Sequence, residues 1–158
     1  MTVMGFQESL ADAVRVSVDN FTVPVVSPVG LVLLKLFAWK DRHHVQPRKD
    51  AADIAYVLRH YSTLLTEKVL FDDYFDIVEA SGFDVDLAAG HVLGRKINKL
   101  AELDTREYLE QLLHNELSQG TDSRLVREVA ETLAGAEEER AFQLLSSLKM
   151  GFDEGAAK

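Results

Sequence analysis

The sequence predicts an α+β fold that is mainly α, with an N-terminal β-hairpin followed by a bundle of about six to seven helices. Three observations support this expectation. Before residue 27, β-branched residues alternate with polar ones, whereas the rest of the chain shows apolar residues at helical spacing. Glycine-containing and acidic breaks divide that remainder into segments of ordinary helix length. With 158 residues, 47% of them hydrophobic, the chain can build one core.

We therefore expect a single domain over residues 1–152. Within it, residues 1–27 would form a hairpin that completes or edges a sheet. Residues 28–61 would form a pair of helices carrying lysine and aspartate, and residues 62–152 a helical bundle. The last residues, 153–158, have the sequence DEGAAK and are expected to form a loose tail.

The hairpin is predicted from two extended runs with a turn between them. Valines alternate with polar residues over positions 14–18, and Asp19 and Asn20 then provide a turn signal. A β-branched run resumes from Thr22 to Val26. These two runs are expected to pair as antiparallel strands.

The helices are predicted from capping signals and apolar spacing. Ser27 can cap a helix that runs from about Pro28 to Lys40, because proline is favoured at the first helical position. After the short loop DRHHVQP, Pro47 opens a second helix that extends through Tyr61. Further helices are expected at residues 64–80, 87–100, 105–117, 122–133 and 137–150.

Composition excludes several classes of function. The chain has no cysteine, so it has no disulfide, thiolate metal site or cysteine nucleophile, and it suits a reducing compartment. A net charge of −9 disfavours non-specific binding to nucleic acid, which depends on Lys and Arg at phosphates. The first 14 residues do not show the basic start and uninterrupted apolar core that are typical of a signal peptide, and the apolar run over residues 23–39 contains Pro24, Pro28 and Lys35. We expect a cytoplasmic protein that does not span a membrane.

Lys35 lies within VGLVLLKLFAW, a run that is otherwise apolar apart from glycine. On a helix it shares a stripe with two leucines and Arg42, so we expect it to be at least half buried. A buried ammonium group needs an opposite charge or a functional anion. The next helix carries Asp50 and Asp53 at the head of an apolar face, and the short loop makes the two helices neighbours. Lys35 is therefore expected to face Asp50 or Asp53.

Two interpretations of this cluster remain open from the residues alone. One is a structural ion pair that fixes the register of the two helices. The other is a phosphate or nucleotide site, in which Lys35 is the main cation and Arg42, Arg48 and Lys49 are flanking charges. In the second interpretation an aspartate orients the lysine or meets a metal.

The run SPVGLVLLKLFAWKDRHHVQPRKDAADIAYVLRHY resembles a block of the AbiEii/AbiGii toxin family, a branch of the polymerase-β-like nucleotidyltransferases. In that family a block of the form K-L-x-A-x-x-x-R, followed by K/R-D-x-x-D, lies after the catalytic core. The later run FDVDLAAGHVLGRKINKL is similar to the helical part of one subgroup. The matching positions here are Lys35, Leu36, Ala38, Arg42, Lys49, Asp50 and Asp53.

The resemblance implies transfer of a nucleotidyl group from a nucleoside triphosphate (NTP) with Mg²⁺, to an acceptor such as a tRNA end or a protein. Such transfer depends mainly on charge neutralisation and positioning. The setting would be a bacterial toxin held in check by an antitoxin protein. By resemblance, Asp50 or Asp53 is the downstream acidic residue of the active site, so both are candidate catalytic residues. Lys35 would bind nucleotide phosphates with Arg42 as a secondary contact, and no metal ligand is assigned.

The family's metal-binding element, a Gly-Ser turn followed by Asp-x-Asp on a strand, is expected upstream of these residues and is not found there. We therefore expect a truncated C-terminal portion that is inactive by itself and needs the missing N-terminal catalytic half. The stretch ASGFDVDLAAG imitates the element, but its Ser and Gly are inverted and a helix follows, so Asp84 or Asp86 is interpreted as a helix cap.

The alternative is a non-catalytic helical module that binds proteins or nucleotides. The two hypotheses differ in what they expect of residues 3–6 and the hairpin edges. In a nucleotidyltransferase portion these would be apolar surfaces that await a sheet. In a separate module they would be covered, for example in a homodimer.

Overall fold

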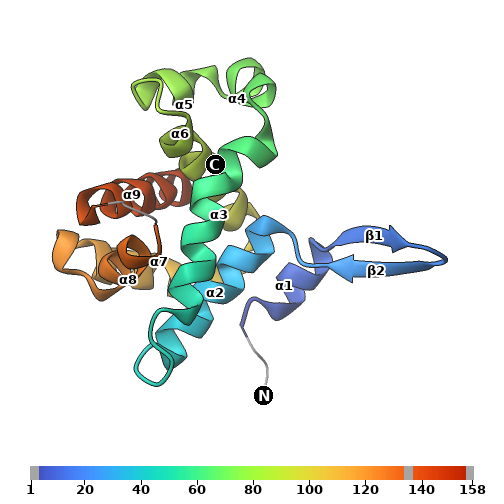
Figure 1. The fold of residues 1–158 in the computed structure, drawn as a ribbon, viewed down its shortest axis with the longest axis horizontal. Coiled ribbons are helices and arrows are strands. Elements are labelled where there is room, and N and C mark those ends of the chain that lie inside the picture. The colour runs from blue at the N-terminus through green and yellow to red at the C-terminus, as the bar shows by residue number, and fades with distance from the viewer. Residues whose placement is uncertain (1–3, 134–136, 156–158) are drawn as a thin grey trace.

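The computed structural model describes residues 4–133 and 137–155, which form two strands and nine α-helices in that part of the chain (Figure 1). This confirms the predicted α+β, mainly α fold. The elements are α1 (Phe6–Ala11), β1 (Val14–Val18), β2 (Phe21–Val25), α2 (Pro28–Arg42), α3 (Lys49–Leu65), α4 (Glu67–Asp73), α5 (Phe75–Ala80), α6 (Val85–Leu100), α7 (Leu103–Leu117), the 3₁₀ turn η1 (Gly120–Asp122), α8 (Arg124–Thr132) and α9 (Glu138–Gly155).

The hairpin forms as predicted and projects from the helical bundle (Figure 1). Its strands pair antiparallel, with Val14 opposite Val25 and Val18 opposite Phe21. Asp19 has a φ of 52°, and the first central residue of a two-residue hairpin turn requires such a positive φ. Every strand residue is exposed, so the apolar side chains of the hairpin face solvent. In this one chain the hairpin is thus available to a sheet or to a second copy, as the two hypotheses respectively require, and residue 3 lies outside the described part.

The bundle is centred on α6 and α9, which pack closely along their length. The backbones of α6 and α9 approach so closely that two positions have room only for glycine. A Cβ on Gly94 would overlap the carbonyl oxygen of Leu148, and one on Gly151 would overlap the carbonyl oxygen of His91. The two helix backbones are therefore nearly in contact. Around this pair, α2, α3, α7 and α8 contribute further fully buried side chains to one continuous core.

Helix α2 carries the apolar run around Lys35 and is capped as predicted. The Ser27 side chain accepts a hydrogen bond from the Gly30 N–H at 3.0 Å. Leu33 and Leu36 are fully buried, whereas Lys35 lies at the edge of the buried face with its side chain 20% exposed. Among the described residues, no helix has the length and apolar character needed to cross a bilayer.

Three segments differ from the sequence prediction. Helix α1 was not expected; Ser9 anchors it by donating to the Gly30 carbonyl, and Glu8 by accepting from Thr105 at 2.6 Å. The single helix expected over residues 64–80 is divided twice: Thr66, with a φ of 65°, ends α3, and Tyr74 separates α4 from α5.

The expected loose tail is also wrong for residues 153–155, which form the last turn of α9. Glu154 in that turn accepts hydrogen bonds from Arg95 and binds His91, both on α6, which ties the turn to the bundle. Residues 156–158 lie outside the described part.

Candidate functional site

Asp50 lies in the first turn of α3 and is the buried centre of a cluster of charges. Its side chain is only 1% exposed. It accepts a hydrogen bond from Lys35 Nζ at 3.1 Å and two from Arg42, at 2.7 Å from Nε and 2.7 Å from Nη2. The paired contact with Arg42 is the strong, bidentate type. The carboxylate also benefits from its place near the N-terminus of α3.

Asp53 lies one turn later and binds the same lysine from the solvent side. Its Oδ2 is 2.6 Å from Lys35 Nζ, and its side chain is 45% exposed. The structure therefore brings together four of the predicted site residues. Lys35 faces both Asp50 and Asp53, as predicted from the helical spacing and the short loop between the helices.

The electrostatics of the cluster favour full ionisation. Burial opposes the charge on Asp50, but the hydrogen bonds from Arg42 and Lys35 outweigh it and hold the pKa of Asp50 below its usual value. Burial likewise opposes the charge on Lys35, yet the contacts with Asp53 and Asp50 raise its pKa. Two cations and two carboxylates thus balance in one small region.

The other two predicted cations do not join this cluster. The side chain of Arg48 instead contacts Glu131 of α8, with Nε 2.5 Å from the carboxylate. Lys49 is exposed at the first position of α3. Arg48 has a φ of 70° and directly precedes α3, so the helix begins at Lys49 rather than at Pro47.

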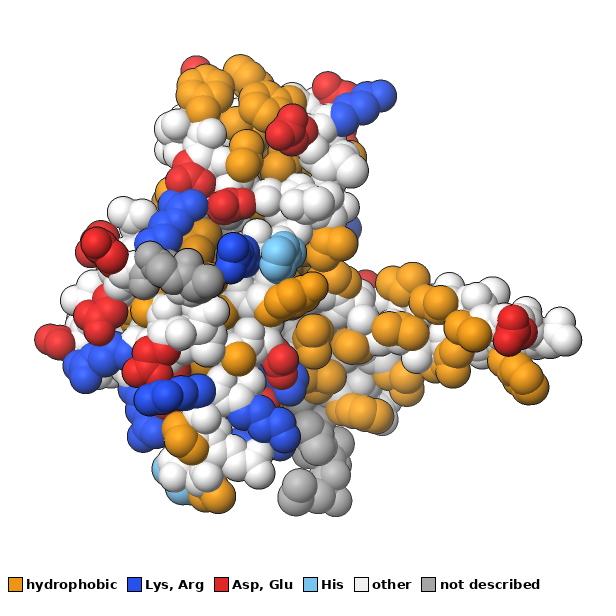
Figure 2. All heavy atoms as spheres, in the orientation of Figure 1, with side chains coloured by type: hydrophobic (Ala, Val, Ile, Leu, Met, Phe, Trp, Pro, Cys, Tyr) orange, Lys and Arg blue, Asp and Glu red, His pale blue; other side chains and the backbone are white. Residues whose placement is uncertain are grey.

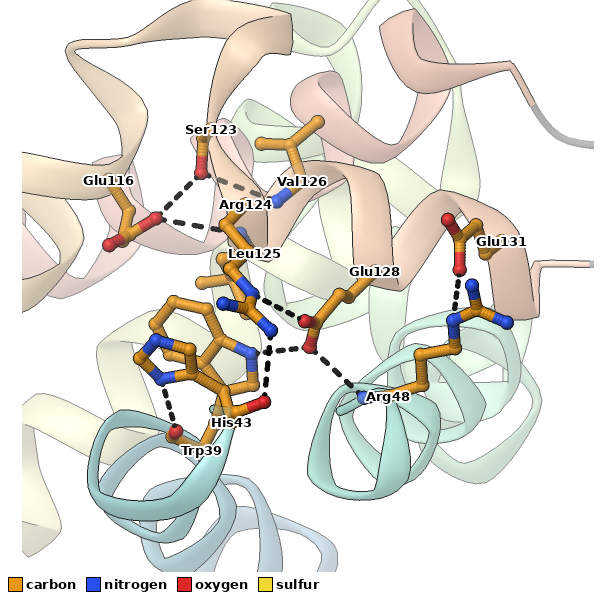
Figure 3. A network of polar contacts seen from close by, with 10 residues as sticks. All are labelled: Trp39, His43, Arg48, Glu116, Ser123, Arg124, Leu125, Val126, Glu128 and Glu131. Carbon is orange, nitrogen blue, oxygen red and sulfur yellow. Dashed lines mark hydrogen bonds and ion pairs between the residues drawn. The ribbon is translucent and has the colours of Figure 1, made fainter. Parts of the chain in front are cut away.

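Glu128 of α8 holds the loop that joins α2 to α3, a role that sequence reasoning missed (Figure 3). Its side chain accepts hydrogen bonds from Trp39 Nε1 at 2.8 Å, the Arg48 backbone N–H at 3.2 Å and Arg124 Nε at 2.8 Å. Arg124 also donates to the His43 carbonyl at 3.0 Å. A buried tryptophan needs an acceptor for its N–H, but Glu128 is far from Trp39 in sequence. The sequence therefore indicates that Trp39 needs a hydrogen-bond acceptor, but it does not indicate that Glu128 is that acceptor.

Glu128 is also ionised in this setting. Burial opposes its charge, but the hydrogen bonds from Arg124, Trp39 and the Arg48 backbone lower the pKa of Glu128. The loop that precedes Asp50 is therefore tied at its end to a charged acceptor on α8. This tie supports the position of α3 beside α2.

The Asp-x-Asp stretch, residues 84–86, forms the N-terminus of α6. Asp84 caps α6 by accepting hydrogen bonds from the N–H groups of Asp86 and Leu87, both at 3.1 Å, and it accepts two more from Arg140. The Arg140 hydrogen bond holds the pKa of Asp84 below its usual value despite burial. Asp86 accepts from Ser62 at 2.7 Å. The interpretation of this stretch as a cap is confirmed for Asp84.

The described residues do not fit a protein-held Mg²⁺. Residues 4–133 and 137–155 contain no group of three or more His, Asp or Glu side chains placed to hold a metal. Within the cluster, both oxygens of Asp50 are occupied by Lys35 and Arg42. Asp53 is the exposed carboxylate of the cluster, and a single carboxylate is too few for a metal site built from protein ligands alone.

Comparison with known families supplies the affiliation. A family model described as nucleotidyl transferase AbiEii toxin, type IV TA (toxin–antitoxin) system, matches residues 4–145. The chain belongs to this family. The match includes the hairpin, the α2–α3 pair with its charge cluster, and most of the bundle. No curated protein and no solved structure matches the chain.

Membership of the AbiEii family indicates a nucleotidyltransferase-like function in a toxin–antitoxin system. It also implies an antitoxin as a partner, and it suggests an NTP and Mg²⁺ as the cofactors of the family reaction. The resemblance noted around Lys35 and Asp50 thus lies within the region that the family model matches.

Proposed function

We propose that Lys35 and Arg42 bind the phosphates of an NTP in a nucleotidyl transfer reaction. The observation that carries this proposal is the side-by-side placement of two cations on one buried carboxylate, Asp50. Phosphoryl and nucleotidyl transfer require positive groups held at fixed positions near the phosphates. The family affiliation of the chain supports the same chemistry.

Asp50 acts in this proposal as a positioning residue. A guanidinium group has five N–H donors, and Asp50 takes two of those on Arg42, so the remaining donors can reach a phosphate. The Arg42 side chain is 42% exposed, which gives an anion access to it. Because Asp50 holds both cations, the geometry of the pair is set before a nucleotide arrives.

Asp53 acts as the exchangeable partner of Lys35. It competes with an incoming phosphate for the ammonium group, and its exposure allows it to move away without leaving a buried charge unpaired. We assign it the role of the acidic residue that faces the nucleotide. A bound metal would neutralise charge on the phosphates, and its carboxylate ligands must come from residues outside this cluster.

The second candidate function is a non-catalytic module that binds proteins or nucleotides. The favouring observation is that the cluster is electrically balanced, with Lys35 and Arg42 both already paired in the structure. A balanced cluster of this kind also suits a purely structural ion pair. Nucleotide binding and nucleotidyl transfer must therefore be measured separately.

The binding test compares two lysines of α2. Titration with ATP, GTP, CTP and UTP in the presence of Mg²⁺ should show binding of at least one nucleotide to the wild type. Lys35→Gln should weaken that binding by about tenfold or more. Lys40→Gln removes an exposed charge from the same helix, outside the cluster, and should leave binding unchanged. Equal affinities in the two variants would refute the phosphate site.

The transfer test uses α-³²P-labelled nucleotides with Mg²⁺ and either bulk tRNA or protein as acceptor. Label that becomes attached to an acceptor, and is lost in Lys35→Gln, supports the enzyme. Nucleotide binding without transfer is the result expected both of a portion that is inactive by itself and of a binding module. If neither binding nor transfer depends on Lys35, the cluster is a structural ion pair.

A further inference from the structure

The exposed side of α3 carries a pair of aromatic rings next to the charge cluster. Tyr56 follows Asp53 by three residues, and His60 follows Tyr56 by four, so the three side chains lie along one stripe of the helix. The rings of Tyr56 and His60 contact each other, with centroids 4.6 Å apart and an interplanar angle of 49°. This pair, which we call the aromatic platform, therefore lies beside the carboxylate that binds Lys35 from the solvent side.

The aromatic platform is open to solvent. Tyr56 is 67% exposed, and His60 is exposed as well. On the other side of the helix, Ile54, Val57 and Leu58 are buried in the core and hold α3 in place without the two rings. Aromatic contacts four residues apart add little to the stability of a helix. The fold therefore does not depend on Tyr56, and its ring is available to a ligand.

Charged and aromatic groups follow one another along the α2–α3 pair. Arg42 and Lys35 both bind Asp50 in the first turn of α3. Lys35 also binds Asp53 one turn later, and the aromatic platform comes next. At a rise of about 1.5 Å per residue, the strip from Asp50 to His60 is about 15 Å long. Figure 2 shows charged side chains gathered over the lower part of this helix pair, with hydrophobic side chains and a histidine directly above them.

A nucleoside triphosphate has the same order of groups, with phosphates at one end, a sugar in the middle and a flat base at the other end. When its phosphates lie at Lys35 and Arg42, a nucleotide that extends along α3 brings its base to the aromatic platform. Aromatic side chains are a common surface on which proteins stack unpaired bases. The platform is therefore placed where the base of such a nucleotide would lie.

The opposite end of the strip offers a poorer surface for a base. The ring of His43 is already stacked on Trp39, with centroids 4.6 Å apart and an interplanar angle of 20° (Figure 3). His44 packs edge-on against His43, and Arg124 donates a hydrogen bond to the His43 carbonyl. This end of the strip is thus occupied by contacts within the protein, whereas the ring of Tyr56 is largely in solvent.

We propose that the aromatic platform stacks against the base of the nucleotide whose phosphates Lys35 and Arg42 bind. This inference rests on the proposed function of the charge cluster. Tyr56 provides the stacking surface, and His60 supports its ring from the next turn of the helix. Asp53 then lies level with the sugar, between the phosphates and the base. Because every base has a π-face, the platform adds affinity without selecting one base over another.

The test compares a nucleotide with inorganic triphosphate, which carries the phosphates but no base. Both ligands are titrated in the presence of Mg²⁺, and the nucleotide is whichever of ATP, GTP, CTP and UTP binds the wild type most tightly. Tyr56→Leu keeps an apolar side chain but removes the ring, so it should weaken nucleotide binding by about tenfold or more. Its affinity for triphosphate should be unchanged. Tyr56→Phe keeps the ring and should bind the nucleotide as the wild type does.

Two further variants serve as controls. Phe75→Leu makes the matched change on α5, where the phenylalanine is 49% exposed, and should leave both affinities unchanged. Lys35→Gln should weaken the binding of both ligands, because both carry phosphates. Far-UV circular dichroism will confirm that every variant is folded.

The outcomes separate this inference from the phosphate site on which it rests. If triphosphate binds through Lys35 but Tyr56→Leu leaves the nucleotide affinity unchanged, the stacking is overturned and the phosphate site stands. An equal loss for both ligands in Tyr56→Leu also overturns it, because the ring would then support the cluster rather than the base. If neither ligand binds in a way that depends on Lys35, the phosphate site fails and the stacking fails with it.

Discussion

Asp50 links the stability of the α2–α3 pair to the arrangement of its charges. Its carboxylate is buried, while the two cations that it binds reach toward solvent. Exposed ion pairs contribute little to stability, but removing the buried member of such a pair is costly because its partners lose their compensating charge. Asp50 and Asp53 both contact Lys35, so they provide a matched comparison of a buried and an exposed partner.

We predict that Asp50→Asn lowers the free energy of unfolding by about 2–3 kcal/mol at neutral pH. The amide keeps the shape of the side chain but removes the charge and turns donors toward Lys35 and Arg42. Asp53→Asn should cost less than about 1 kcal/mol, since that carboxylate is largely in solvent. Urea unfolding of the three proteins measures both values. Equal losses in the two variants would contradict the assigned roles.

The same contacts predict a change in acid stability. Because the pKa of Asp50 is lower in the folded protein, its contribution to stability is fully present above its unfolded pKa, about 3.9. That contribution is lost as the pH falls through the lower, folded value. Asp50→Asn should therefore lose less stability than the wild type on acidification below about pH 4. Urea unfolding at a series of pH values measures this difference. If the free energy of unfolding falls equally in both proteins below about pH 4, Asp50 has no such role.

At the scale of elements, Glu128 connects α8 to the loop before α3. We predict that Glu128→Gln costs about 1–2 kcal/mol and speeds hydrogen exchange at the Arg48 amide, because a neutral amide replaces a charged acceptor shared by three donors. Glu131→Gln is the control, since Glu131 binds only the exposed side chain of Arg48. Exchange at Arg48 that rises equally in both variants would rule out this anchoring role.

The crossing of α6 and α9 depends on the absence of side chains at the contact. Gly94→Ala should destabilise the protein by about 2–3 kcal/mol, because its Cβ overlaps the backbone of α9 at Leu148 and neither helix can yield cheaply. Gly90→Ala, one turn earlier on α6, puts a Cβ 3.4 Å from the Leu144 carbonyl oxygen and should be tolerated better. Thermal unfolding of the pair measures the difference. A Gly90 variant as unstable as the Gly94 variant would contradict this account.

The elements that sequence reasoning predicted are those set by local rules. The hairpin followed from alternation and a turn, and the contact of Lys35 with Asp50 followed from helical spacing across a short loop. The break at Thr66 was missed because a left-handed conformation at threonine has no local sequence signal. The contact of Arg48 with Glu131 was not foreseen, because Glu131 is distant in sequence and is placed by the packing of α8.

The whole molecule combines a packed bundle with a hairpin that makes few contacts with it (Figure 1). The side chains of Leu93, Ile97 and Leu148, on α6 and α9, are fully buried, whereas every strand residue is exposed. Local opening requires less free energy where few apolar contacts are lost. The two parts should therefore differ in the rate at which their amides exchange with solvent.

We predict that amides of α6 and α9 exchange only through global unfolding, while those of β1 and β2 exchange at least about 100-fold faster in dilute protein. Hydrogen exchange read by mass spectrometry compares the strands with the two helices. A hairpin as protected as the bundle would contradict this account and would show that its backbone hydrogen bonds are stable despite the exposure of every strand residue.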